Sequence, residues 1–140
     1  MKRHAFQFDV ASPEIEIILD HYRNPRNFGD LPDATVRAKD SNPLCGDVVE
    51  MHLKIEGDRI VDVRFKGKGC AISQASASML TERIKGMTLD EARKLGRDDV
   101  IEMLGVQLSP VRVKCATLSL KVLKLAIYTH LGIKLEEKES

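Results

Sequence analysis

The chain has 140 residues, a length typical of one domain, with a hydrophobic fraction of 43%, a charged fraction of 31% and a formal net charge of +1. Lys and Arg are scattered among nearly as many Asp and Glu, which argues against a nucleic-acid partner. No apolar run reaches the roughly 20 residues that span a membrane, and the N-terminal residues lack the apolar core of a signal peptide. We therefore expect a cytoplasmic protein without a membrane partner, whose three cysteines are thiols or metal ligands rather than disulfide partners.

The predicted elements begin with a helix from Ser12 to about Arg23. Ser12 is a favourable N-cap residue, and Pro13 suits the first helical position. The preceding residues, 1–11, are expected to be flexible. A short strand is predicted over residues 34–39.

Two strands of alternating apolar and polar residues come next. Residues 48–56 and 59–66 place apolar side chains at every second position, which is typical of half-buried strands. Gly57-Asp58 joins them, so the pattern predicts an antiparallel hairpin. His52 falls on the polar face of the first of these strands and is expected to be solvated.

Helical periodicity replaces the alternation in the second half of the chain. Thr88 and Glu91 form a capping-box pattern for one short helix. Strands and helices are segregated along the chain, which predicts an α+β fold: a small antiparallel three-stranded sheet with helices on one face, in a single domain over 1–140. We expect helices over 71–85, 88–96 and 98–104, a loop over 105–114, a long helix over 115–131 ended by Gly132, and a flexible charged tail over 133–140.

The three cysteines all fall at predicted junctions between elements. Cys45 lies in a turn before the hairpin, Cys70 lies between the hairpin and a helix, and Cys115 opens the last helix. A thiol at a junction can face outward from an end of the fold. Cys70 and Cys115 are expected at helix N-termini, where the helix dipole favours the thiolate that binds metal. Gly46 and Gly69 keep side chains away from the sulfurs and let the backbone approach a ligand.

Three thiolates are one donor short of a tetrahedral metal site or a four-ligand cluster. Asp47, two residues after Cys45, is the expected fourth donor. A carboxylate is a harder ligand than a thiolate and suits iron–sulfide or zinc chemistry less well, so such a site would hold its metal less tightly. The alternative is that the cysteines belong to the core, since free Cys is among the most buried residue types.

Two cations close to Cys115 are candidate supporting residues. Lys114 is expected to act as a charge partner that favours the thiolate, and its alternatives are a solvated lysine or an occasional nitrogen ligand. Arg112 is expected to pair with Asp47 when metal is absent, or else to be a surface charge. His21, on the first helix, is expected to be a surface or packing histidine rather than a metal ligand.

Four segments of the chain together resemble the IscU/SufU family of iron–sulfur cluster assembly scaffolds, which also occurs as the N-terminal domain of NifU. The segments are LDHYRNPRNFG (19–29), NPLCGD (42–47), GKGCAISQASASML (67–80) and LSPVRVKCATL (108–118). The resemblance implies the same α+β fold, and a transient [2Fe-2S] cluster, or zinc, held by Cys45, Asp47, Cys70 and Cys115. It also implies a cysteine desulfurase, an iron source and apo-protein acceptors as partners.

The chain departs from both branches of that family. IscU members carry His before the last Cys, whereas this chain has Lys114 in a segment, 112–118, that looks like SufU. SufU members carry an insertion between the second and third Cys that this chain lacks. Leu108–Arg112 resembles the Leu-Pro-Pro-Val-Lys segment that an Hsp70-type chaperone grips in IscU, but Ser109 and Arg112 differ from it.

Three functions therefore remain open at the level of sequence. The first is a non-enzymatic scaffold that builds a [2Fe-2S] cluster from iron and desulfurase-derived sulfur and transfers it to apo-proteins. The second is a SufU-like zinc-dependent sulfurtransferase, in which Cys45, Cys70 or Cys115 accepts persulfide sulfur. The third is a structural zinc module that binds partners.

Overall fold

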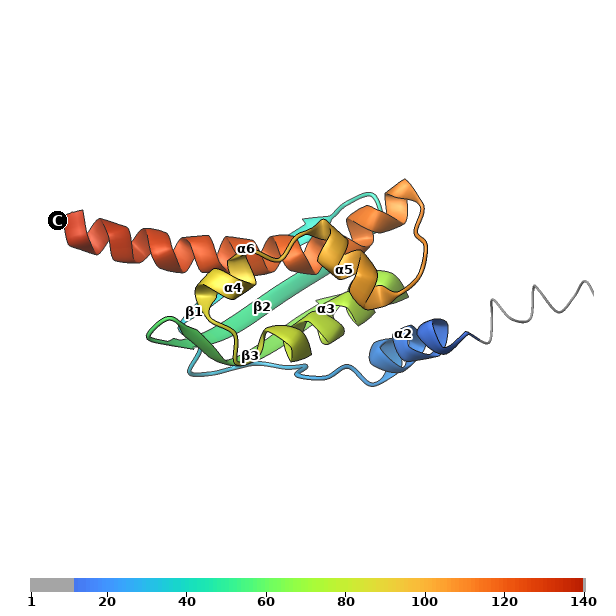
Figure 1. Cartoon of the computed structure of the whole chain (residues 1–140), viewed down its shortest axis with the longest axis horizontal. Coiled ribbons are helices and arrows are strands. Elements are labelled where there is room, and N and C mark those ends of the chain that lie inside the picture. The colour runs from blue at the N-terminus through green and yellow to red at the C-terminus, as the bar shows by residue number, and fades with distance from the viewer. Residues whose placement is uncertain (1–11, 140) are drawn as a thin grey trace, which may run out of the picture.

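The computed structural model describes residues 12–139, and the prediction made for residues 1–11 lies outside that range. The three strands form one antiparallel sheet in the order β1-β2-β3. The predicted α+β fold, with an N-terminal helix and a long C-terminal helix, is confirmed. In chain order the elements are α2 (Pro13–Arg23), β1 (Val36–Asn42), β2 (Asp47–Glu56), β3 (Arg59–Lys68), α3 (Ala71–Ile84), α4 (Leu89–Arg93), α5 (Arg97–Leu104) and α6 (Pro110–Glu139) (Figure 1).

The strands run further toward the cysteines than the alternation predicts. β1 ends at Asn42 and β2 begins at Asp47, so the connection between them is a tight turn. Asn42 lies opposite Asp47, and Val48 lies opposite Lys68, in the register of the sheet. The register therefore brings the residues next to Cys45 and those next to Cys70 together at one end of the sheet.

Helices α3 and α6 cover one face of the sheet, and α2 packs on α3 (Figure 1). The apolar residues of β2 and β3 that alternate toward this face are fully buried. α3 carries mainly Ala and Ser on its buried positions, which lets it approach its neighbours closely. Ser76 Oγ donates a hydrogen bond to the carbonyl oxygen of Ala116 at 2.6 Å, which joins α3 to α6.

The other face of the sheet is partly covered by the segment between α2 and β1. The N–H of Gly29 donates to Phe65 O at 2.9 Å, and the N–H of Leu31 donates to His52 Nδ1 at 3.2 Å. His52 Nε2 lies 2.7 Å from a carboxylate oxygen of Glu50. His52 is only 2% exposed, so the prediction that it is solvated is wrong. Alternation correctly assigned its face, but it could not show that a distant segment crosses that face.

The predicted start of the last helix is also wrong. α6 begins at Pro110, five residues before Cys115. Proline suits the first helical position, and the N–H of Val113 donates to Ser109 O at 2.9 Å to begin the helical hydrogen bonds. The helix also continues through Gly132, which was expected to end it.

His21 packs between α2 and α3, which selects the packing role from the two expected for it. Its Nδ1 lies 2.7 Å from Ser78 Oγ on α3, and the ring is buried. Burial lowers the pKa of His21, and the nearby Arg26 guanidinium acts in the same direction. No helix within residues 12–139 is long and apolar enough to cross a bilayer.

Candidate metal-binding site

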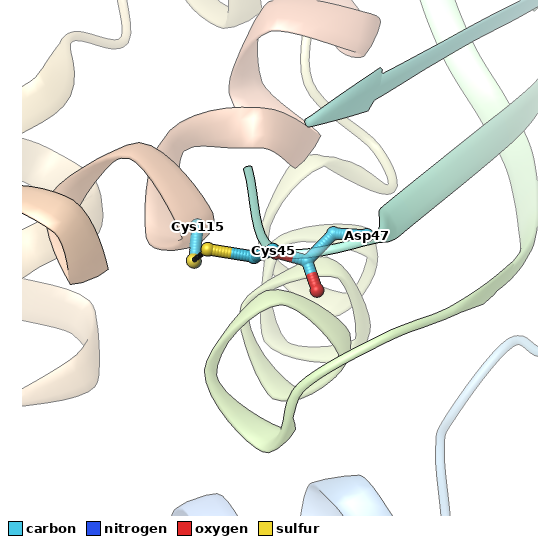
Figure 2. A group of neighbouring side chains, drawn as sticks. All are labelled: Cys45, Asp47 and Cys115. Atoms are coloured by element: carbon cyan, nitrogen blue, oxygen red, sulfur yellow. Dashed lines mark hydrogen bonds between the residues drawn. The ribbon is translucent and has the colours of Figure 1, made fainter. Parts of the chain in front are cut away.

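Three of the four predicted donors meet at one end of the sheet. Cys45 comes from the turn between β1 and β2, Asp47 is the first residue of β2, and Cys115 lies on α6. A sulfur from each cysteine and a carboxylate oxygen from Asp47 all lie within 4.8 Å of one another. The two sulfurs are 3.0 Å apart, and Figure 2 shows Cys45 between Asp47 and Cys115.

Cys70 reaches this group from the opposite side of Asp47. It forms the N-cap of α3, as the sequence predicted, and is half-buried. Its backbone N–H donates to Asp47 Oδ1 at 2.8 Å, and its sulfur lies 3.9 Å from Asp47 Oδ2. The Asp47 carboxylate therefore lies between Cys70 and the two other cysteines.

Asp47 is completely buried, with an exposed fraction of 0%. No Lys or Arg within the part of the chain that the structure describes forms an ion pair with it. The predicted pairing with Arg112 is therefore not seen, and Arg112 is exposed on the first turn of α6. A buried carboxylate without a cationic partner is costly, so this position favours the arrival of a positively charged ligand.

Asp47 lies so close to the backbone at residue 69 that only glycine fits there. Its φ of +142° is one that side chains rarely adopt, and a Cβ built on it would collide with Asp47 Oδ1. Gly46 differs, because a Cβ there would meet only open space and its φ of +69° reflects the turn alone. The sequence predicts that Gly69 lets the backbone approach a ligand; the structure shows the backbone at Gly69 close to the Asp47 carboxylate.

Cys115 does not lie at a helix N-terminus. It is completely buried inside α6, and burial, with contacts to Cys45 and Asp47, raises the pKa of its thiol. The predicted thiolate at the start of the helix is therefore wrong, because α6 begins five residues earlier than expected. Lys114 is exposed, and no contact of its ammonium with the donor atoms is present within the described residues, which favours the solvated-lysine alternative.

Asn42 is a further member of the site, which the sequence patterns did not single out. Its carbonyl oxygen accepts the N–H of Cys45 at 3.2 Å, and its side-chain oxygen accepts the N–H of Leu44 at 3.3 Å. Its amide nitrogen lies 3.8 Å from the sulfur of Cys115. Asn42 thus joins the Cys45 turn to α6. An Asn before a Pro in a tight turn was the available signal.

Residues 14–137 match the family model described as NifU-like N terminal domain. The chain belongs to this family. The resemblance inferred from the four sequence segments is therefore confirmed.

Relatives of this NifU-like domain come from both branches of the family. The chain is 40% identical over 134 residues to the zinc-dependent sulfurtransferase SufU of Bacillus subtilis. The match covers 84% of this chain and 90% of that protein. It is 40% identical over 116 residues to the iron-sulfur cluster assembly scaffold protein IscU of Escherichia coli, covering 80% of this chain and 89% of that protein.

Solved structures agree with the fold of the NifU-like domain. A putative iron-sulfur cluster assembly scaffold protein for the SUF system from Fervidobacterium islandicum superposes with a TM-score of 0.70 at 34% identity, covering 80% of this chain and 94% of that chain. A NifU-like N-terminal protein from Brucella abortus gives a TM-score of 0.71 at 24% identity, covering 90% and 97%. The second comparison supports the fold alone.

The donor chemistry of this NifU-like domain suits either zinc or an iron–sulfur cluster. Zinc is bound by thiolate sulfur and by carboxylate oxygen, and clusters are held mainly by thiolates. Three cysteines with one carboxylate provide such a mixed set. Metal binding would require loss of the Cys115 proton, since the thiolate is the ligand form.

Proposed function

We propose that this chain is an iron–sulfur cluster assembly scaffold, which holds a [2Fe-2S] cluster on Cys45, Asp47, Cys70 and Cys115 and releases it to apo-proteins. The observation that carries the proposal is the buried Asp47 carboxylate, which has cysteine sulfurs on both sides and no cationic partner among the described residues. The cluster is cargo and not a resident cofactor, so the chain need not be an enzyme.

The donor set favours release as well as binding. A carboxylate matches iron and sulfide less well than a fourth thiolate does. Cys45 and Cys70 are half-buried, so an acceptor can approach two of the four donors from solvent. Cys115 is fully buried on α6, so this donor is held in place by the surrounding core.

The expected partners are a cysteine desulfurase, an iron source and apo iron–sulfur proteins in the cytoplasm. The segment Leu108–Arg112 is the proposed contact for an Hsp70-type chaperone. Its last four residues are exposed, and Val111 is 54% exposed. This accessibility supports the proposal, since a chaperone that grips the segment must reach it from solvent.

The test is anaerobic reconstitution of the protein with iron, cysteine and a cysteine desulfurase, followed by addition of apo-ferredoxin. Visible absorbance and circular dichroism report the cluster on each protein. We expect a cluster to form on this chain and then to move to the ferredoxin. Absence of any cluster under these conditions would reject the scaffold proposal.

A second candidate, a zinc-dependent sulfurtransferase, is favoured by the relative named SufU and by the SufU-like segment around Lys114. In this role the thiolate of Cys45, which is half-buried, would attack the outer sulfur of the desulfurase persulfide. The new S–S bond forms on Cys45 as the old one breaks, and the desulfurase cysteine leaves as a thiolate. This candidate predicts retained zinc and faster desulfurase turnover, and an indifferent desulfurase would reject it.

A purely structural zinc module is the third candidate, and it predicts loss of the fold on chelation. The apolar core between the sheet and helices α3 and α6 includes none of the four proposed donors. We therefore expect helical circular dichroism to survive zinc removal. Collapse of the signal would favour the structural module instead.

A further inference from the structure

A hollow of about 290 Å³ lies beside Cys70, along the edge of β3. Its walls include Tyr22 and Phe28, which are 44% and 52% exposed. Phe65 forms part of its floor, and the rings of Phe28 and Phe65 meet edge to face with centroids 5.3 Å apart. Gly67 and Lys68 complete the side that belongs to the strand. We call these five residues the edge groove.

The neighbouring chain segment covers the edge of β3 only as far as Phe65. The N–H of Phe65 donates to Asn27 O at 2.8 Å, and its carbonyl accepts the N–H of Gly29 at 2.9 Å. Beyond Gly29 the chain turns beneath the sheet, where the N–H of Leu31 bonds to His52. The part of the edge that follows Phe65 is therefore not covered by this segment.

Gly67 directs its polar groups toward this uncovered edge. Residues two apart on an antiparallel strand direct their N–H and C=O groups to the same side. Since those of Phe65 point away from β2, those of Gly67 do so too, and the register between β2 and β3 is regular at this point. Within residues 12–139 neither group has a hydrogen-bond partner, so a strand-edge donor and acceptor face the groove.

We propose that the edge groove binds an extended peptide segment of a partner protein, which adds to β3 at Gly67. The open N–H and C=O pair would bond to the peptide backbone, which is the basis of strand addition. An apolar side chain of the peptide would then lie against Tyr22 and Phe28, since both rings are exposed and line the same hollow.

The charge of the groove further defines the peptide. Lys68 is exposed, and no acidic side chain of the described residues pairs with it. An acidic residue next to the apolar one would therefore match the groove. The lining of the hollow also includes Gly69, the residue before Cys70, so a bound segment would hold its parent protein beside the proposed donor site. The inference does not depend on which cargo that site carries.

The test uses isotope-labelled, metal-free full-length protein and a set of acetylated, amidated heptapeptides. Each peptide has Phe, Tyr, Leu or Val at its centre with Asp on both sides. Nuclear magnetic resonance follows binding and the hydrogen exchange of the Gly67 amide. We expect the best peptide to slow this exchange by about tenfold or more. N-methylation of its central amides should weaken binding by about tenfold, because the peptide loses the N–H that donates to the Gly67 carbonyl and the methyl group obstructs the strand edge.

Matched variants distinguish binding in the edge groove from non-specific binding elsewhere on the surface. Tyr22→Ala and Lys68→Glu should each weaken the best peptide severalfold. Tyr128→Ala and Lys39→Glu, an aromatic and a lysine outside the groove, should leave its affinity unchanged. If no peptide binds, or if binding leaves Gly67 exchange and the N-methyl comparison unchanged, the proposal is overturned. The peptides carry neither metal nor sulfur, so these results are independent of whether the chain assembles clusters.

Discussion

The two ends of the sheet satisfy their polar groups in opposite ways. At the hairpin end, the N–H of Gly86 donates to Ile60 O at 2.8 Å, and the N–H of Ile60 donates to Met87 O at 2.8 Å. The N–H of Leu89 donates to Asp58 O at 2.6 Å, so the turn is tied to α4. Every one of these bonds joins backbone to backbone and needs no particular side chain.

At the donor end, by contrast, the polar atoms belong to side chains. Cys45 and Cys115 contact each other, the amide nitrogen of Asn42 lies 3.8 Å from the sulfur of Cys115, and the buried Asp47 accepts the backbone N–H of Cys70 at 2.8 Å. Groups that are costly to bury without partners are thus gathered where a ligand could satisfy them. We therefore expect stability and ligand binding to depend mainly on different ends of this small sheet, so that each can be changed separately.

Cys45→Ser is expected to have the largest effect, and to change zinc affinity without changing stability. Loss of one thiolate should lower zinc affinity by about a hundredfold or more, since even supporting residues around metals account for about 10–100-fold. Isothermal titration with a competing chelator measures this change. The urea midpoint of the metal-free variant should remain within error of wild type, because Cys45 is only half-buried. Leu44→Ala, in the adjacent exposed position, is the control and should change neither quantity.

Gly69→Ala should destabilise the donor end of the sheet, because it disturbs the backbone next to Asp47. The new Cβ would collide with Asp47, and its φ of +142° is strained for any side chain. We expect the free energy of unfolding to fall by about 3 kcal/mol and zinc binding to weaken with it. Gly57→Ala, in an open turn at the hairpin end, should lose only about 1 kcal/mol and keep zinc affinity. Equal losses in the two variants would contradict the role given to Gly69.

Thr88→Ala tests the hairpin end alone. Thr88 Oγ1 accepts the N–H of Glu91 at 3.1 Å, and the Glu91 carboxylate accepts the N–H of Thr88 at 2.9 Å. Removing the cap should cost about 1 kcal/mol of unfolding free energy. Chemical denaturation measures this loss. Zinc affinity should be unaltered, and a parallel loss of zinc would show that the two ends are coupled.

The smallest effect is a pH dependence of the metal-free protein. Burial raises the pKa of the Cys115 thiol above its ordinary value of 9.0. The unfolded chain therefore loses this proton near pH 9 while the folded chain keeps it, so stability is complete below pH 9 and declines as the pH rises above it. Denaturation from pH 8 to pH 10 should show this decline in wild type and less of it in Cys115→Ala. An identical slope in both proteins would assign the decline to other groups.

The sequence predicted the elements whose signals are local. Ser12 and Pro13 defined the start of α2, and the Ser12 side chain does accept the N–H of Ile15 at 3.2 Å. The hairpin around Gly57-Asp58 and the Thr88 capping box were likewise predicted correctly, because each depends on residues a few positions apart.

The errors came from features that depend on distant segments or on an ambiguous residue. Pro110 was assigned to a loop, although proline equally begins a helix, and this error moved Cys115 from the helix interior to its start. The burial of His52 depends on a segment some twenty residues earlier in the chain. The absence of an Arg112–Asp47 pair could not be predicted either, since it depends on how deeply the sheet end is buried.

The most direct test of the scaffold account is the lifetime of a reconstituted cluster in wild type, Asp47→Ala and Asp47→Asn, measured by visible circular dichroism during transfer to apo-ferredoxin. Asp47→Asn is the matched variant, because its amide oxygen can still accept the Cys70 N–H that Asp47 accepts at 2.8 Å. If the carboxylate is the labile ligand, both variants should hold the cluster longer than wild type and transfer it more slowly. Lifetimes equal to wild type in both variants would contradict the account.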